Sequence, residues 1–179
     1  METIINKIKE LGADNANIID VKDICLDSSF RKMCASNACG MYGRNYQCPP
    51  HIGDIDILMN KVRSYDKAIV YQSIYEIEDS YDFEGMMAAG KKHNKLTHKL
   101  HQYLKQNKQD LSYLLLSAGG CKLCDKCAIL TNEPCRNKDF AISSLEAYGI
   151  NVSLLAESAN MKYINGINTV TYFGIILIK

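Results

Sequence analysis

The sequence predicts an α/β fold: a single domain over residues 1–179, with a mixed β-sheet, flanking helices and cysteine-rich metal-binding loops at one end. From residue 54 onward, helical and strand patterns alternate along the chain, which is typical of a sheet with helices packed against it. The chain has 179 residues, of which 47% are hydrophobic. That is enough for one well-packed core and too short to require two.

The first third of the chain predicts two helices, one short strand and a long loop. A helix over residues 3–11 places isoleucine and leucine on one stripe and ends at Gly12. A strand at residues 18–21 precedes the first cysteine segment, residues 25–53, where glycine and proline interrupt regular structure. Asp54 then caps a second helix. Its apolar positions are Ile55, Leu58, Met59, Val62 and Tyr65.

The middle of the chain predicts strand, helix and strand. Residues 67–77 are rich in β-branched and aromatic side chains and favour a strand. Asp82 caps a long helix that reaches about Gln106. Its inward side chains are expected to be Phe83, Met87, Leu96, Leu100 and Leu104. Residues 111–117 form an almost continuous apolar strand, the kind that is buried on both faces.

The last third predicts one more helix and two strands. Asn137 is expected to cap a helix that ends at Gly149. Strands are expected at residues 150–155 and 169–178, and a short loop would let them pair antiparallel.

Composition excludes several classes of function. A net charge of +1 gives no reason to expect attraction to nucleic acid or to a membrane surface. The N-terminus lacks the layout of a secretory signal, and the apolar run at residues 172–178 is far shorter than a membrane span. There is also no Walker sequence, no dinucleotide fingerprint, no H-E-x-x-H and no nucleophile elbow. We therefore expect a cytoplasmic protein that keeps its cysteines reduced.

The second cysteine segment carries the strongest chemical signal. It has the spacing Cys121-x2-Cys124-x2-Cys127-x7-Cys135, and Gly119-Gly120 precedes it. This pattern is typical of a [4Fe–4S] cluster, since short turns at fixed offsets aim successive thiolates at one inorganic core. Basic residues around the thiols favour a cluster with net negative charge. A structural zinc site is the alternative, although zinc is usually held by two separated C-x2-C pairs.

The first cysteine segment is less specific, with the spacing Cys34-x4-Cys39-x8-Cys48 followed by two prolines. Three interpretations stay open. Cys48 could complete the cluster begun by the second segment. The three thiols could hold a second metal site with an open or non-cysteine fourth position, for which His51 is the nearest candidate. They could also only pack a structural loop. Cys25 lies outside both spacings and is expected to be an ordinary buried thiol. We expect the two segments to approach each other in the fold.

These motifs resemble a family of small prokaryotic proteins described as predicted metal-binding proteins. The similarity covers nearly the whole chain, and three groups of residues carry it: Cys34…Cys39-x2-Tyr42-Gly43, Cys48-Pro49-Pro50-His51 and Gly120-Cys121-x2-Cys124-x2-Cys127…Cys135-Arg136. The resemblance implies an iron–sulfur site at the cysteines of the second segment, with those of the first as further candidates. This chain has Asn137-Lys138 where the family usually has a proline shortly after the Cys-Arg step.

The function expected from the sequence is iron–sulfur binding, with one or two clusters and electron transfer to a redox partner protein as its use. Two alternatives stay open: a structural zinc protein that acts as an interaction module, and an enzyme that binds substrate at an open cluster iron. The many lysines and histidines after Asp82, including His98 and His101, are expected to form a solvated helix surface.

Overall fold

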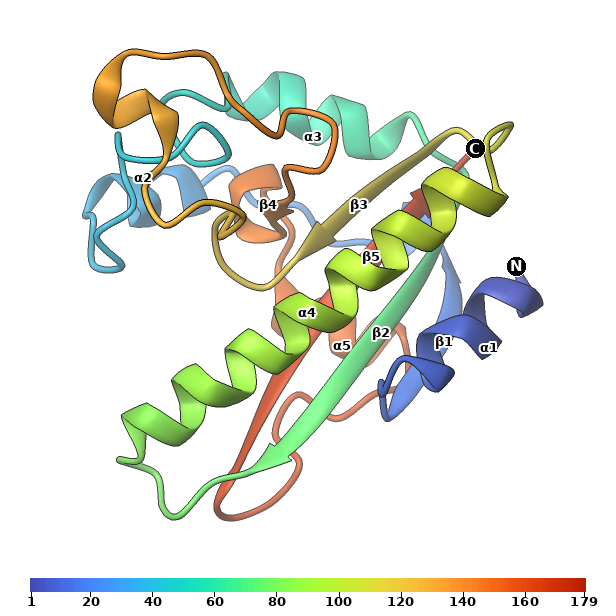
Figure 1. Cartoon of the computed structure of the whole chain (residues 1–179). Helices are drawn as coiled ribbons and strands as arrows, with labels where there is room; N and C mark the ends of the chain where they lie inside the picture. Colours follow the sequence, from blue (N-terminus) through green and yellow to red (C-terminus); the bar gives the residue numbers. More distant parts are fainter.

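The computed structural model, which describes residues 1–179, is built around a five-stranded mixed sheet with the order β1-β2-β5-β3-β4 (Figure 1). The strands are β1 (Asn15–Asp20), β2 (Lys67–Glu76), β3 (Tyr113–Ser117), β4 (Ser143–Ser144) and β5 (Thr169–Ile178). The first three pairings in this order are antiparallel, and β3 pairs with β4 in parallel. The prediction of an α/β fold with a mixed sheet is confirmed.

Five α-helices and three short 3-10 helices surround the sheet. The α-helices are α1 (Glu2–Glu10), α2 (Phe30–Ala35), α3 (Ile55–Arg63), α4 (Phe83–Asn107) and α5 (Val152–Ser158). The 3-10 helices are η1 (Val21–Asp23), η2 (Ala128–Thr131) and η3 (Glu146–Tyr148). Both predicted aspartate caps form, because Asp54 accepts from the amide of Asp56 at 2.9 Å and Asp82 from the amide of Gly85 at 2.7 Å. No helix is long and apolar enough to span a bilayer.

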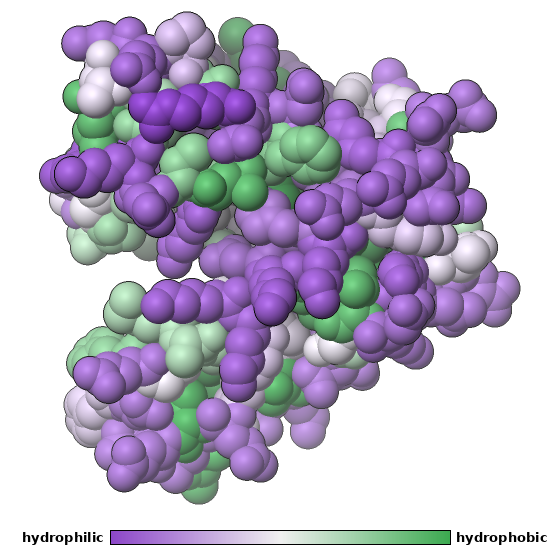
Figure 2. All heavy atoms as spheres, viewed as in Figure 1, coloured by the Kyte–Doolittle hydropathy of each residue, from purple (hydrophilic) through white to green (hydrophobic).

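The sheet is buried on both faces, and alternate residues of its central strands face opposite layers. In β2, Ile69 and Tyr71 pack in the core with α1 and α4, whereas Ala68 and Val70 pack in the core with α3, η3 and α5. All four side chains are fully buried, and hydrophilic residues cover most of the face of the molecule seen in Figure 2. Burial of a large apolar side chain of this kind contributes about 1.5–3 kcal/mol, so the two cores fix the sheet as the rigid part of the molecule.

A buried polar chain ties α4 to the end of β3. The Tyr71 hydroxyl lies 2.9 Å from Thr97 Oγ1, which lies 3.1 Å from the Ser117 hydroxyl. Gly174 of β5 makes room for the tyrosine ring, because a Cβ at this glycine would lie 2.2 Å from Tyr71 Cζ. Ser117 is the last residue of β3 and stands just before Gly119-Gly120. The scaffold therefore fixes the start of the second cysteine segment.

The predictions of two elements in the C-terminal third of the chain are wrong. The helix expected over residues 137–149 is absent, and the chain instead passes through β4 and η3. Gly149 still acts as a helix stop, because it is the C-cap of η3 and has a φ of 77°. Pairing of β4 with β3 holds this segment extended. The strand expected over residues 150–155 is helix α5, whose N-terminus is capped by Asn151, which accepts from the amide of Leu154 at 3.2 Å. The expected antiparallel pairing of the last two strands is therefore wrong as well.

The helix predicted from Asp82 forms, but its first turns pack differently from the prediction. Phe83 and Met87 are 70% and 65% exposed, because the packed part of α4 begins only at Ala89. Conversely, His101 is buried and packs edge-on against Tyr113 and Phe140, although the sequence predicted a surface position. Burial lowers the pKa of His101 to about 4.

Candidate metal centre

The two cysteine segments are separated in the sequence by two helices and two strands, α3, β2, α4 and β3, but lie against each other in the fold. Asn45 of the first segment donates from Nδ2 to the carbonyl oxygen of Cys121 at 2.7 Å. The Tyr46 hydroxyl donates to the carbonyl oxygen of Glu133 at 2.8 Å. In Figure 1 the two segments are the cyan and the gold-to-orange loops beside the end of β3. The expectation that they approach each other is confirmed.

The sequence analysis did not identify Asn45 and Gln47, which connect the first cysteine segment to the rest of the site. Asn45 is only 2% exposed, and its Oδ1 also accepts from the amide of Gln47 at 2.9 Å. The Gln47 side chain accepts from the Ser143 hydroxyl at 2.6 Å, which connects the first segment to β4. An amide side chain in a glycine- and proline-rich loop has no distinctive spacing, so only the fold reveals this bridge.

The four cysteines of the second segment line one cavity of about 580 Å³, here called the four-cysteine cavity. They are Cys121, Cys124, Cys127 and Cys135, all half-buried. The cavity is also lined by four basic side chains and one acidic side chain: Arg44, Lys122, Lys126, Arg136 and Asp125. The walls therefore carry net positive charge beside the thiols, which favours an anionic occupant.

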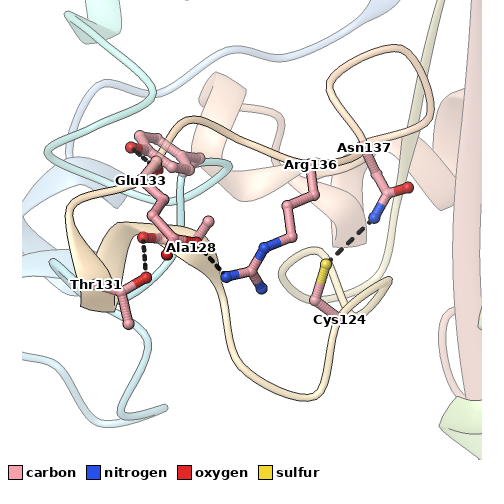
Figure 3. Close-up of polar contacts among 7 residues, drawn as sticks. Cys124, Ala128, Thr131, Glu133, Arg136 and Asn137 are labelled. Atoms are coloured by element: carbon pink, nitrogen blue, oxygen red, sulfur yellow. Dashed lines mark hydrogen bonds and ion pairs between the residues drawn. The ribbon is translucent and has the colours of Figure 1, made fainter.

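The loop that closes this cavity is held by short-range polar contacts (Figure 3). Asn137 donates from Nδ2 to the Cys124 sulfur at 3.3 Å, and the guanidinium of Arg136 forms an ion pair with Glu133. The Thr131 hydroxyl donates to the carbonyl oxygen of Ala128 at 3.1 Å. Asn137, which was expected to cap a helix, thus donates a hydrogen bond to one of the candidate ligands.

The three cysteines of the first segment line a second, adjoining cavity of about 670 Å³, here called the three-cysteine cavity. Its thiols are Cys34, Cys39 and Cys48. Three aromatic side chains, Phe30, Tyr42 and Tyr163, also line it, and Glu146 is its one carboxylate. Met41 and Lys122 line both cavities. Cys48 lines the cavity of its own segment, and Cys135 lines that of the second.

The Gly119-Gly120 pair forms part of the wall of the three-cysteine cavity. A Cβ on Gly120 would lie 2.9 Å from the Cys48 sulfur. Only glycine therefore lets the second segment approach this thiol so closely without a shift. The pair was noticed in the sequence for its position before Cys121, but its contact with Cys48 depends on the tertiary fold.

Burial and crowding disfavour thiolates here unless a cation accompanies them. The pKa of Cys48 is raised to about 11, first by burial and then by the neighbouring thiols of both segments, in the order Cys39, Cys34, Cys121 and Cys127. Burial also raises the pKa of Cys34 and of Cys121, and that of the Glu146 carboxyl. Groups that resist ionisation when alone become anionic ligands when a metal supplies positive charge, and binding then releases protons.

The thiols surround spaces and do not converge on one point. No three histidine, cysteine, aspartate or glutamate side chains lie close enough together to hold a single metal ion. In a tetrahedral zinc site, Zn–S bonds of about 2.3 Å place the sulfurs about 3.8 Å apart.

Two further candidates lie outside both cavities. His51 is exposed, and its Nε2 lies 3.3 Å from the carbonyl oxygen of Gly43, so it does not provide the fourth position for the first segment. Cys25 is exposed, which makes the prediction of a buried thiol wrong. All eight cysteines are free thiols.

The α/β fold and the two thiol-lined cavities define the class of protein: an α/β scaffold that presents clustered cysteines from two loops. The chain belongs to the family of predicted metal-binding proteins designated DUF2284, whose model matches residues 17–178. That range contains every cysteine of the two cavities, so metal binding in general is the property that family and site share. No curated protein and no solved structure matches the chain.

Proposed function

We propose that this protein binds a [4Fe–4S] cluster in the four-cysteine cavity and uses it for electron transfer. The observation that carries the proposal is that Cys121, Cys124, Cys127 and Cys135 line a single cavity and follow the C-x2-C-x2-C spacing. Soft thiolate ligands suit iron–sulfur clusters, and four of them match the ligand number of a cubane.

The residues around the thiols fit such a group. Lys122, Lys126 and Arg44 offset the negative charge of a cluster held by four thiolates. The hydrogen bond from Asn137 to the Cys124 sulfur removes electron density from that ligand, which raises the reduction potential of the bound group. A cluster bound here supplies one-electron chemistry, and the protein holds it and sets its potential.

The position of the cavity supports exchange of electrons with another protein. Its four cysteines are only half-buried, so a bound group would lie near the surface. The basic side chains around them offer a docking surface to a redox partner protein that presents acidic groups. Free thiols throughout the chain fit a reducing compartment, and we propose that the protein acts in the cytoplasm.

Metal and sulfide analysis of the full-length protein, purified without oxygen, tests this function. We expect brown protein that contains iron and acid-labile sulfide in equal amounts and bleaches when dithionite is added. Colourless protein with stoichiometric zinc, even after anaerobic reconstitution with iron and sulfide, would instead establish the structural zinc alternative.

A further inference from the structure

We propose that the three-cysteine cavity holds a second iron–sulfur cluster, ligated by Cys34, Cys39 and Cys48 and, at its fourth iron, by the carboxylate of Glu146. This inference rests on the proposed function, since it requires that the chain assembles iron–sulfur clusters at all. It assigns a non-cysteine ligand that comes from outside both cysteine segments.

The first step is the separation of the thiols into two sets. All four cysteines of the second segment line one cavity and all three of the first line the other, with no cysteine common to both. Cys48 lines the three-cysteine cavity and not the four-cysteine cavity. Three thiolates around a cavity of about 670 Å³ leave one ligand position of a cubane to be supplied.

The second step identifies the fourth ligand by elimination. The lining of the three-cysteine cavity contains no histidine and one carboxylate, Glu146. The imidazole of His51 contacts the backbone of its own loop and lies outside the cavity lining. Glu146 follows β4 at the start of η3, and pairing of β4 with β3 fixes this segment at the edge of the sheet.

The third step concerns charge. No basic side chain of the protein lies within ion-pair distance of Glu146. Arg31, which lies on α2 nearby, donates from Nη1 to the carbonyl oxygen of Gly53 at 2.8 Å and from Nη2 to that of Ala147 at 3.5 Å. Lys122 lines the cavity but forms no ion pair with Glu146. An unpaired carboxylate grouped with three thiols is unfavourable, whereas the irons of a cluster would compensate all four groups.

A carboxylate oxygen is a harder ligand than a thiolate and binds cluster iron less firmly. The fourth iron should therefore leave first on oxidation. With ferricyanide as a one-electron oxidant, [4Fe–4S]²⁺ releases Fe²⁺ and one electron and becomes [3Fe–4S]⁺, while ferricyanide is reduced to ferrocyanide. The oxidised three-iron cluster has a characteristic EPR signal. A cluster with four thiolate ligands should resist this step.

The test compares four full-length proteins reconstituted anaerobically: wild type, Cys39→Ala, Glu146→Gln and Glu146→Cys. The wild type should hold about eight irons, four in each cluster, and Cys39→Ala about four. Ferricyanide should produce the three-iron EPR signal in the wild type. Glu146→Gln should show that signal at a lower ferricyanide concentration than the wild type or lose the second cluster, and Glu146→Cys should keep about eight irons and show no signal. Circular dichroism checks that each variant is folded.

Each other outcome has a distinct meaning. About four irons in the wild type, unchanged in Cys39→Ala, would overturn the second cluster but leave the first intact. An equal three-iron signal in the wild type and in Glu146→Cys would overturn Glu146 as the ligand. Absence of iron and sulfide from every protein would overturn the proposed function itself.

Discussion

The four-cysteine and three-cysteine cavities are both lined by cysteine sulfurs but are built in different ways. The first draws all its thiols from one short segment, residues 121–135, and is ringed by basic side chains. The second combines residues 34–48 with Gly119-Gly120 and Glu146, and three aromatic side chains line it. The comparison shows that one site follows from local spacing, whereas the other exists only because the sheet brings distant segments together.

Removal of a central thiol from the four-cysteine cavity should have the largest effect. We expect Cys124→Ala to lose about four irons per chain and most of its soluble yield, since loss of a ligand also removes binding energy that is coupled to folding. Iron analysis and the yield of soluble protein measure this. Cys25→Ala is the matched control, because Cys25 is exposed and lies outside both cavities, and it should keep its iron. Equal iron loss in the two variants would contradict the assignment.

Acid should weaken the scaffold beneath both cavities through His93, which is fully buried between the rings of Tyr71 and Tyr172. Its Nε2 lies 3.2 Å from the carbonyl oxygen of Phe173 and so carries the proton, and Nδ1 accepts from the Ser73 hydroxyl at 2.5 Å. Burial lowers the pKa of His93 to about 4. The unfolded chain binds this proton below about pH 6.5, so the folded state loses stability as the pH falls from about 6.5 to 4.

The expected loss from His93 is of the order of 3 kcal/mol between pH 7 and pH 4. Urea unfolding of metal-free protein at a series of pH values measures it. His93→Gln should be less stable at pH 7, but its free energy of unfolding should decline less as the pH falls. The lowered pKa of His101 contributes equally to the decline in both proteins. If the wild type and the variant decline in parallel, the acid sensitivity arises elsewhere.

The contact between the two segments at Gly120 should be sensitive to a single methyl group. Gly120→Ala places a Cβ 2.9 Å from the Cys48 sulfur and should destabilise the protein by about 2 kcal/mol, as overpacking of a buried site does. Iron should be lost from the three-cysteine cavity before the four-cysteine cavity. Thermal unfolding and iron analysis measure the two effects.

Gly90→Ala is the control for this substitution. Its Cβ would lie 3.3 Å from the hydroxyl oxygen of Tyr172, on a helix where alanine is favoured over glycine by up to about 1 kcal/mol. We expect little net change in stability and unchanged iron content. Comparable iron loss in Gly90→Ala and Gly120→Ala would show that Gly120 has no special relation to Cys48.

Loss of the hydrogen bond from Asn45 to Cys121 should have the smallest effect on stability and iron retention in this series. Asn45→Ala leaves the carbonyl oxygen of Cys121 without its donor and should cost about 1–2 kcal/mol. Both cavities should then lose iron faster to a chelator. Asn107→Ala is the matched control, since Asn107 is exposed and donates only to the carbonyl oxygen of Tyr103. Identical chelation rates in the two variants would exclude a bridging role for Asn45.

Sequence patterns predicted the sheet scaffold well where apolar periodicity was strong. Strands β2 and β5 and helix α4 form close to their predicted bounds, because their own burial determines them. The segment over residues 137–155 was mispredicted because contacts from elsewhere decide it: β3 pairs with β4, and Gln47 binds Ser143. Asn151 was the available signal for α5, since an asparagine before an apolar run is a helix cap.

The spacing of the second segment predicted that its four cysteines lie together, whereas the grouping of Cys34, Cys39 and Cys48 stayed open in the sequence. The positions of Cys121, Cys124 and Cys127 are set by local turns, and local turns can be recognised in a sequence. Glu146 is about 100 residues from Cys48 in the sequence and follows no motif. Its place in the three-cysteine cavity depends on the β3–β4 pairing, which residue patterns did not reveal.

The two sites differ in how strongly a bound group would restrict the unfolded chain, because their ligands are separated by different distances in the sequence. A group bound by the thiols of residues 121–135 closes a loop of about 15 residues, whereas a group bound by Cys48 and Glu146 closes one of about 100. By the chain-entropy relation for cross-links, the longer loop restricts the unfolded chain by about 1.5–2 kcal/mol more. The three-cysteine cavity would then act as a reversible cross-link between the N-terminal and C-terminal parts of the chain, and its loading state would set how readily the whole protein unfolds.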